Sequence, residues 1–302
     1  MNWCGRRDEW STTVLIVSLP NLTGGAAVGE EVSRSKKRSI IEVVIFVVLL
    51  LSLYFLLKPS GGQNLPEGQF GTPRVAILDQ LSLYLPNQAF VQLSMSMLTE
   101  AGFEVDYYRG NEVTVDLYRR LPSLGYKLII MRVHSGLMFK ENKITKNVTF
   151  FTSETYSTTK YVLEQLRDEV VPAIVSFTPT FMGNEPVYFA ITPEFVKSSM
   201  EGRFENTVIV MMGCNGLTYT PMAEALIQRG ALVYIGWNLP VSIDYVDNAT
   251  LHLLNGLIAE KKTILDAVVD TRNKVGTDPN YDAELVFYPT TVEVQNFTVR
   301  AG

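Results

Sequence analysis

Cysteine and histidine are both scarce in this sequence of 302 residues, which contains two of each. The two cysteines, Cys4 and Cys214, are too few for a disulfide framework or for a zinc site built from thiolates. Charge is also sparse, with 19% charged residues and a net charge of −5. Because no basic stripe stands out, we expect no nucleic-acid partner, and we expect neither a metal nor a cofactor. Few residues are left for each catalytic role.

What the sequence does contain is enough apolar chain for a sizeable core and one long apolar run. Hydrophobic residues make up 47%, which suffices for one large domain or two small ones. Residues 40–57, IIEVVIFVVLLLSLYFLL, are apolar except for Glu42 and Ser52. Such a run nearly matches a hydrocarbon core of about 30 Å when helical. We therefore predict a single transmembrane helix over residues 39–58.

The charges beside this run predict its orientation. Four basic residues lie between positions 34 and 38, and only Lys58 closely follows the span. The positive-inside rule places the N-terminus in the cytoplasm and the remaining chain outside the cell membrane. An uncleaved anchor is favoured over a cleaved signal peptide, because the preceding segment is long and no small-residue cleavage site follows. Asn147, Asn248 and Asn296 begin glycosylation sequons in the part predicted to lie outside.

Composition also divides the chain into segments. Residues 1–38 are weakly patterned, and we predict a cytoplasmic segment without regular structure. Residues 59–73, PSGGQNLPEGQFGTP, are rich in glycine and proline, which is typical of a linker. The folded domain is expected over residues 74–290 and a C-terminal tail over residues 291–302.

Within the folded part, short apolar runs alternate with helical patterns. Strands are expected at 75–78, 103–107, 127–133, 187–191, 208–212, 231–235 and 285–288, of which 127–133, 208–212 and 231–235 have the continuous apolar character of buried strands. Helices are expected at 87–100, 115–121, 161–170, 193–200, from 221, 244–259 and 264–274. This alternation predicts βαβ units and an α/β fold with a mostly parallel sheet flanked by helices. Residues 139–156 alternate polar and apolar, which predicts a surface hairpin beside the third strand.

Two reactive side chains each follow a predicted buried strand: His134 after 127–133, and Cys214 after 208–212 and Gly213. Neighbouring strand ends of an open α/β sheet present their side chains at one edge. A cysteine nucleophile needs a nearby base, and histidine titrates close to neutrality. A structural interpretation stays open, since a lone cysteine after a strand is usually a small buried hydrophobe. His252 is interpreted as a packed or surface residue.

The strand blocks IIMRVHSG (129–136) and VIVMMGCNG (208–216) resemble the paired His and Cys blocks of the caspase-like cysteine peptidases. The continuation MAEALIQRGALVYIGW (222–237) is most similar to CHAT and separase sequences. The resemblance implies a three-layer α/β/α domain with Cys214 as nucleophile and His134 as general acid/base. It also implies that the backbone N–H groups of Gly136 and Cys214 stabilise the oxyanion. Two departures are Ser135, where the family has glycine, and Gly213 before the cysteine.

Four further residues are candidates for a substrate pocket: Asp79, Trp237, Asp244 and Asp247. In related enzymes that cut after arginine or lysine, an acidic residue lies under the substrate side chain. The alternative for each aspartate is a helix cap or a turn. The sequence thus predicts a membrane-anchored, outward-facing cysteine endopeptidase acting on a peptide or protein. An inactive caspase-like module that binds a peptide or partner, and an unrelated Rossmann-like domain with a buried cysteine, remain alternatives.

Overall fold

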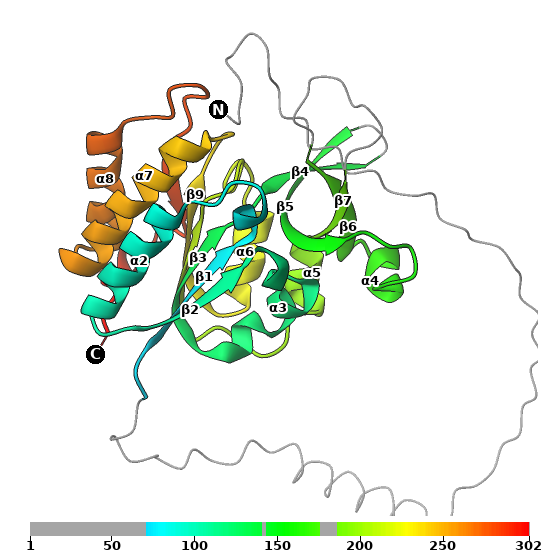
Figure 1. Ribbon diagram of the computed structural model, residues 1–302, viewed down its shortest axis with the longest axis horizontal. Coiled ribbons are helices and arrows are strands. Elements are labelled where there is room, and N and C mark those ends of the chain that lie inside the picture. The colour runs from blue at the N-terminus through cyan, green and yellow to red at the C-terminus, as the bar shows by residue number, and fades with distance from the viewer. Residues whose placement is uncertain (1–70, 141–142, 176–185, 302) are drawn as a thin grey trace, which may run out of the picture. The chain divides into compact units, whose positions relative to one another are not determined.

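The structure of the protein, a computed structural model, describes residues 71–140, 143–175 and 186–301 (Figure 1). The predicted cytoplasmic segment 1–38, the predicted transmembrane helix 39–58 and most of the linker 59–73 lie outside these residues. Within the described ranges, no helix has the length and apolar character needed to span a bilayer.

A mixed sheet forms the centre of the described domain, with strand order β10-β9-β8-β3-β1-β2. Neighbouring strands run parallel except β10, which is antiparallel to β9. The strands are β1 (Arg74–Asp79), β2 (Glu104–Arg109), β3 (Tyr126–Arg132), β8 (Thr207–Met211), β9 (Ala231–Trp237) and β10 (Leu285–Tyr288). The predicted α/β fold with a mostly parallel sheet is confirmed.

Helices cover both faces of this sheet, which explains why its central strands β3, β8 and β9 are nearly continuous apolar runs. Figure 1 shows α2 (Gln88–Glu100), α7 (Ile243–Leu254) and α8 (Ile264–Val275) on one face. The opposite core is formed with α3 (Val115–Arg120), α5 (Pro193–Ser198) and α6 (Pro221–Gln228). Short turns of helix complete the layers: η1 (Gln80–Leu83), η2 (Gly110–Glu112), η3 (Leu121–Leu124) and the π-helical η4 (Asn255–Ala259), which extends α7.

A second, antiparallel sheet has the strand order β4-β5-β7-β6. Its strands are β4 (Ser135–Lys140), β5 (Lys143–Thr155), β6 (Val170–Ile174) and β7 (Val187–Ile191). The predicted hairpin is present as β4 and β5, but it begins directly after His134. It is also less superficial than predicted, because successive side chains of β5 enter two different cores. Phe150 packs in the larger core beside the main sheet, and Phe151 packs in a small cluster with Val171 and Ala190.

Three sequence predictions need correction. In the predicted helix 87–100, helical spacing places Leu93 on the apolar face with Phe90 and Leu98. Leu93 is nevertheless 55% exposed, because the buried stripe of α2 runs through Phe90, Ser94 and Leu98. The helix expected at 161–170 is only α4 (Val162–Leu166). In the segment predicted as a C-terminal tail, the described residues 291–301 pack against the domain. They form α9 (Val292–Gln295), and both Val294 and Val299 are buried in the core shared with α8.

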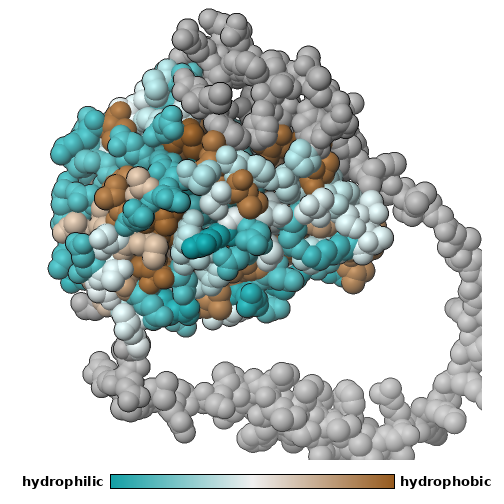
Figure 2. Space-filling view, in the orientation of Figure 1, coloured by the Kyte–Doolittle hydropathy of each residue, from teal (hydrophilic) through white to brown (hydrophobic). Residues whose placement is uncertain are grey.

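The surface of the described domain is mixed in polarity. On the face seen in Figure 2, apolar residues form several small groups separated by hydrophilic ones. Two large clusters of buried apolar side chains lie on the two sides of the main sheet. The apolar content of the folded part is therefore concentrated against the sheet whose edge carries His134 and Cys214.

Candidate functional site

His134 and Cys214 lie at matched positions beyond two adjacent strands. β3 and β8 are neighbours and parallel, and their last aligned pair is Met131 opposite Met211. The ladder continues one step further, since the Met212 N–H donates to the Met131 carbonyl at 2.9 Å. Each of the two candidate residues comes three positions after that last pair. The structure thus places at the carboxyl ends of two adjacent strands the two residues that the sequence predicted as a pair.

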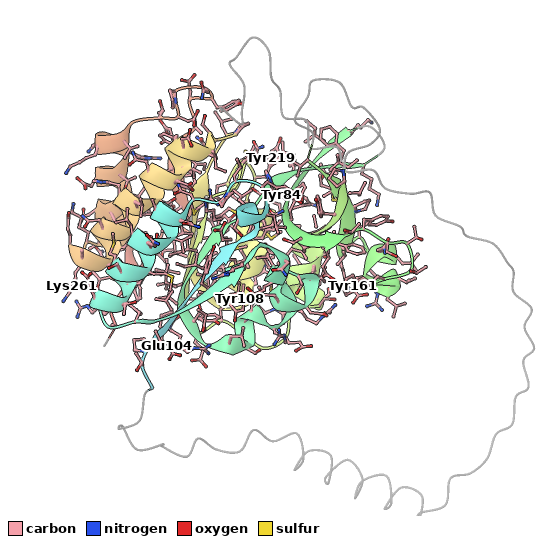
Figure 3. All side chains as sticks on the ribbon, viewed as in Figure 1. Tyr84, Glu104, Tyr108, Tyr161, Tyr219 and Lys261 are labelled. Atoms are coloured by element: carbon pink, nitrogen blue, oxygen red, sulfur yellow. The ribbon has the colours of Figure 1, made fainter. Side chains whose placement is uncertain are left out.

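The same edge gathers side chains that follow other strands. In Figure 3, Tyr84, which follows β1, and Tyr219, which follows β8, are labelled near each other at this end of the sheet. Glu104, the first residue of β2, is labelled at the opposite end. The Tyr84 hydroxyl hydrogen-bonds the hydroxyl of Tyr188 in β7. The second sheet is therefore anchored to the carboxyl edge of the main sheet, beside the candidate site.

Ser135 and Gly213 tie the two strand ends together. The Ser135 hydroxyl donates a hydrogen bond to the Cys214 carbonyl oxygen at 2.6 Å. A Cβ atom at position 213 would lie 2.3 Å from that hydroxyl oxygen and 2.5 Å from the Val133 carbonyl oxygen. Only glycine fits there. The two departures from the caspase-like pattern are thus one packing feature, in which the serine hydroxyl fills the space that a side chain at 213 would need.

Backbone alternation decides which N–H groups face Cys214. Successive residues of a strand direct their N–H and C=O groups to opposite sides. The Val133 carbonyl faces Gly213, whereas the His134 N–H donates to Gln80 Oε1 on the β1 side at 2.9 Å. By the same alternation, the N–H of Ser135 points back toward the β8 side. That is the side on which Cys214 lies.

Gly136, the predicted oxyanion donor, is a member of the β4–β5 ladder. It pairs with Thr149, and the Phe151 N–H donates to the His134 carbonyl at 3.0 Å. In an antiparallel pair the hydrogen-bonded positions recur every second residue, so the Gly136 N–H faces Thr149. The geometry therefore favours the Ser135 N–H over that of Gly136 as a donor beside Cys214.

The imidazole of His134 is held in its neutral form. Its ring packs against Phe151 with centroids 5.9 Å apart, and its Nε2 atom is buried. Burial, and then the positive charge of Arg132, lower the pKa of His134 from 6.5 to about 4. At neutral pH this imidazole is therefore unprotonated, as a general base must be, and its low pKa makes it a weaker base than a free histidine.

The lowered pKa of His134 predicts a loss of stability in acid. Between about pH 6.5 and pH 4 the unfolded chain binds a proton at this residue that the folded chain does not. The free energy of unfolding should fall through that window, by at most about 3 kcal/mol. Denaturant unfolding of the wild type and of His134→Gln at several pH values measures the effect, since other groups titrate equally in both. Parallel curves for the two proteins would contradict the lowered pKa.

Cys214 is half-buried, and its thiol lies against the segment after β9. The Sγ atom is 3.6 Å from the Val241 carbonyl oxygen, so the thiol can donate to it. Asn215 follows with a φ of 59°, in the left-handed region. Asn215 and Gly216 lie in a turn, which directs the chain away from the sheet directly after the thiol.

Two of the predicted pocket residues bind a buried arginine of the protein itself. Arg132 Nη1 donates to Asp79 Oδ1 at 2.8 Å, and its Nε and Nη2 donate to the Asp247 carboxylate at 2.8 and 2.9 Å. All three residues are buried. Burial acts to lower the pKa of Arg132, but the bonds to Asp247 and the charge of Asp79 outweigh it, so this pKa is raised. Sequence reasoning missed Arg132, although a lone arginine in the apolar run KLIIMRV was a signal for a buried charge with partners.

The other two pocket candidates lie in different surroundings. Trp237 is fully buried in the core on the α7 side of the sheet. Asp244 is exposed in the first turn of α7. The four residues are thus not brought together as one wall, since Asp79 and Asp247 face Arg132. Asp244 is the acidic candidate that solvent reaches most freely.

Asn87 links the buried cluster of Arg132, Asp79 and Asp247 to the start of α2. Its Oδ1 accepts the Phe90 N–H at 3.0 Å, which caps the helix, and its Nδ2 donates to Asp247 Oδ2 at 2.8 Å. We expect Asn87→Ala to lower the free energy of unfolding by about 2–3 kcal/mol, because a cap and a bond to a buried charge are both lost. Asn87→Ser, which keeps a capping oxygen, should lose about half as much in denaturant unfolding. A loss below about 0.5 kcal/mol for alanine would contradict both roles.

Comparison with known proteins identifies no relative of this chain. No family model matches the sequence, and no curated protein is significantly similar to it. In the described part of the chain, no group of three or more histidine, cysteine, aspartate and glutamate side chains is placed to hold a metal ion. The Cys214 thiol and the His134 imidazole, beyond the carboxyl ends of β8 and β3, are therefore the reactive groups that can support a function.

Proposed function

We propose that this chain is a cysteine endopeptidase of the caspase-like type, anchored in the cell membrane by residues 39–58 with its folded domain outside. Cys214 is the nucleophile and His134 the general base. One observation carries the proposal: both residues occupy matched positions beyond the adjacent parallel strands β3 and β8. A sheet with helices on both faces is also the architecture that the resemblance of the two blocks implies.

The chemistry follows from the groups at this edge. His134 accepts the thiol proton as the Cys214 sulfur attacks the carbonyl carbon of a peptide bond. The proton then passes to the departing amine, which leaves a thioester on Cys214. Water hydrolyses the thioester, with His134 again as the base. The N–H groups of Ser135 and Cys214 are the proposed donors to the oxyanion that forms at each step.

Cleavage after a basic residue is the specificity that we propose. Asp79 and Asp247 are bound to Arg132, whereas Asp244 is exposed and available to a substrate cation. Among peptide substrates that differ only in the residue before the cut, arginine and lysine should be preferred over glutamine. Asp244→Asn should remove that preference, and an unchanged preference would exclude this role.

Labelling by peptides with a thiol-reactive ketone tests the dyad. The whole chain should become labelled at Cys214 and lose label in Cys214→Ala. His134→Ala should slow the reaction by about a hundredfold or more, the size of general-base effects. Cys4→Ala and His252→Ala are matched controls, because they remove the other cysteine and histidine of the sequence. A wild type that never labels, or label that persists in Cys214→Ala, would exclude the proposal.

A second candidate is a peptide-binding module of the same fold without turnover. The contact of the Cys214 thiol with the Val241 carbonyl favours it, because a thiol that donates a hydrogen bond is protonated and weakly nucleophilic. This alternative predicts that the domain retains a peptide partner after Cys214→Ala and cleaves nothing in either form. Cleavage that depends on Cys214 would exclude it.

A further inference from the structure

Gln80 is a buried polar residue directly next to the candidate dyad. It is the first residue of η1, immediately after β1, and its side chain is fully buried. Oε1 of its amide accepts the backbone N–H of His134 at 2.9 Å. Nε2 of the same amide is buried and has no hydrogen-bond partner among the residues that the structure describes. The acceptor Oε1 is thus the half of the amide with a defined partner, and that partner is the backbone of the proposed base.

The place of this amide in the sheet indicates what it does. β1 and β3 pair in parallel as far as Asp79 opposite Arg132. Beyond that pair the chain of β1 turns into η1, while the chain of β3 continues to His134. The N–H of His134 points to the side where β1 has ended. The Gln80 side chain therefore accepts the hydrogen bond that a continuing β1 strand would accept. The backbone N–H of His134 is thereby held by a side chain and not by the hydrogen-bond ladder of a neighbouring strand.

The backbone that carries Gln80 is itself anchored. The Asp79 carboxylate accepts bonds from Arg132 Nη1 at 2.8 Å and from the Tyr107 hydroxyl at 2.9 Å. Its carbonyl oxygen accepts the Ser82 hydroxyl at 2.7 Å. Because the residue before it is held on both sides, the Gln80 amide is presented to His134 without a large loss of side-chain freedom.

We propose that Gln80 is a positioning residue, which holds the backbone of His134 so that its imidazole stays in place to activate Cys214. This role rests on the proposed function of the dyad. It acts through the acceptor Oε1 alone. Methionine at position 80 has a similar size but no acceptor, whereas glutamate keeps an acceptor oxygen in either protonation state. The two substitutions therefore separate the hydrogen bond from the volume of the side chain.

The rate at which iodoacetamide alkylates Cys214 tests the role. It is measured in the whole chain by mass spectrometry of the peptide that carries Cys214, with the Cys4 peptide as an internal reference. Gln80→Met should slow the reaction about tenfold, because a displaced base loses much of its effect. Gln80→Glu should restore the rate to within about twofold of the wild type, since the bond is remade. The melting temperature of Gln80→Met should be close to that of the wild type. The substitution removes the unpaired Nε2 donor of Gln80 but leaves the His134 N–H without its acceptor.

Each outcome decides the matter. A wild-type rate in Gln80→Met, with a slow His134→Ala, would overturn the role of Gln80 and leave the dyad standing. A rate in Gln80→Glu as low as in Gln80→Met would also overturn it, because the bond would then not be the cause. If His134→Ala reacts as fast as the wild type, the proposed function fails, and this role fails with it. Should Gln80→Met not fold, Gln80→Asn withdraws the acceptor by one methylene and serves the same comparison.

Discussion

Replacing Arg132 by methionine is expected to lower the free energy of unfolding by about 3–5 kcal/mol, a large part of the about 5–15 kcal/mol that stabilises a typical domain. The guanidinium is 1% exposed and lies between Asp79 and Asp247, which are both buried. Without it, two carboxylates remain in a region of low dielectric with no cation to balance them. Denaturant unfolding of the variant and the wild type measures the loss.

Two control variants separate the charge from the volume of the side chain. Arg203→Met removes an exposed arginine and should change stability by less than about 0.5 kcal/mol. Adding Asp79→Asn and Asp247→Asn to Arg132→Met should restore much of the lost stability, because the uncompensated charges disappear. If Arg132→Met alone is as stable as the wild type, the buried cluster does not hold the strand ends as described.

Gly213→Ala is expected to lower stability by about 3 kcal/mol and to abolish labelling of Cys214. The new methyl carbon would stand 2.3 Å from the Ser135 hydroxyl oxygen and 2.5 Å from the Val133 carbonyl oxygen. A hydroxyl can rotate away, but the carbonyl belongs to the backbone that continues β3. The strand ends must then separate, and the candidate nucleophile and base move apart with them.

A matched glycine isolates this effect. Gly236→Ala in β9 would meet its nearest neighbours at 3.6 Å, an ordinary contact, and should stay close to the wild type in both stability and labelling. Ser135→Gly combined with Gly213→Ala should recover part of the stability, because one of the two close contacts is removed. Normal labelling in Gly213→Ala alone would show that the two strand ends need not be in close contact for the site to form.

The strands of the main sheet were predictable, because apolar runs such as 127–133 and 208–212 fit a sheet that is covered on both faces. Their order was not. That β3 lies beside β8, with His134 level with Cys214, depends on the pairing of segments 80 residues apart, between which the chain forms the whole second sheet. β6 escaped prediction because Pro172 demotes a strand pattern, and the structure places it at a sheet edge, where proline is tolerated.

The candidate site was predictable in part, because its two reactive residues directly follow apolar runs that can be recognised in the sequence. Residues at strand ends, His134 and Cys214, could be found from local pattern alone. The meaning of Asp79 and Asp247 required their partner, because a carboxylate that binds Arg132 and one that awaits a substrate look alike in sequence. The hydrogen-bond donor beside Cys214 could be identified only from the register of β4 against β5. In that register the Gly136 N–H belongs to the β4–β5 ladder, so the Ser135 N–H is the one that remains for an oxyanion.

The most direct test of the Cys214–His134 dyad is to trap the acyl group during turnover. The whole chain is mixed with a library of peptides, and the reaction is quenched in acid. The protein is then digested, and the mass of the peptide that carries Cys214 is measured by mass spectrometry. A cysteine peptidase predicts a thioester adduct on Cys214 that hydroxylamine removes, together with cleaved peptides that are absent with Cys214→Ala and present with Cys4→Ala. Cleavage that persists without Cys214, or a Cys214 that is never acylated while peptides are cut, would contradict the dyad.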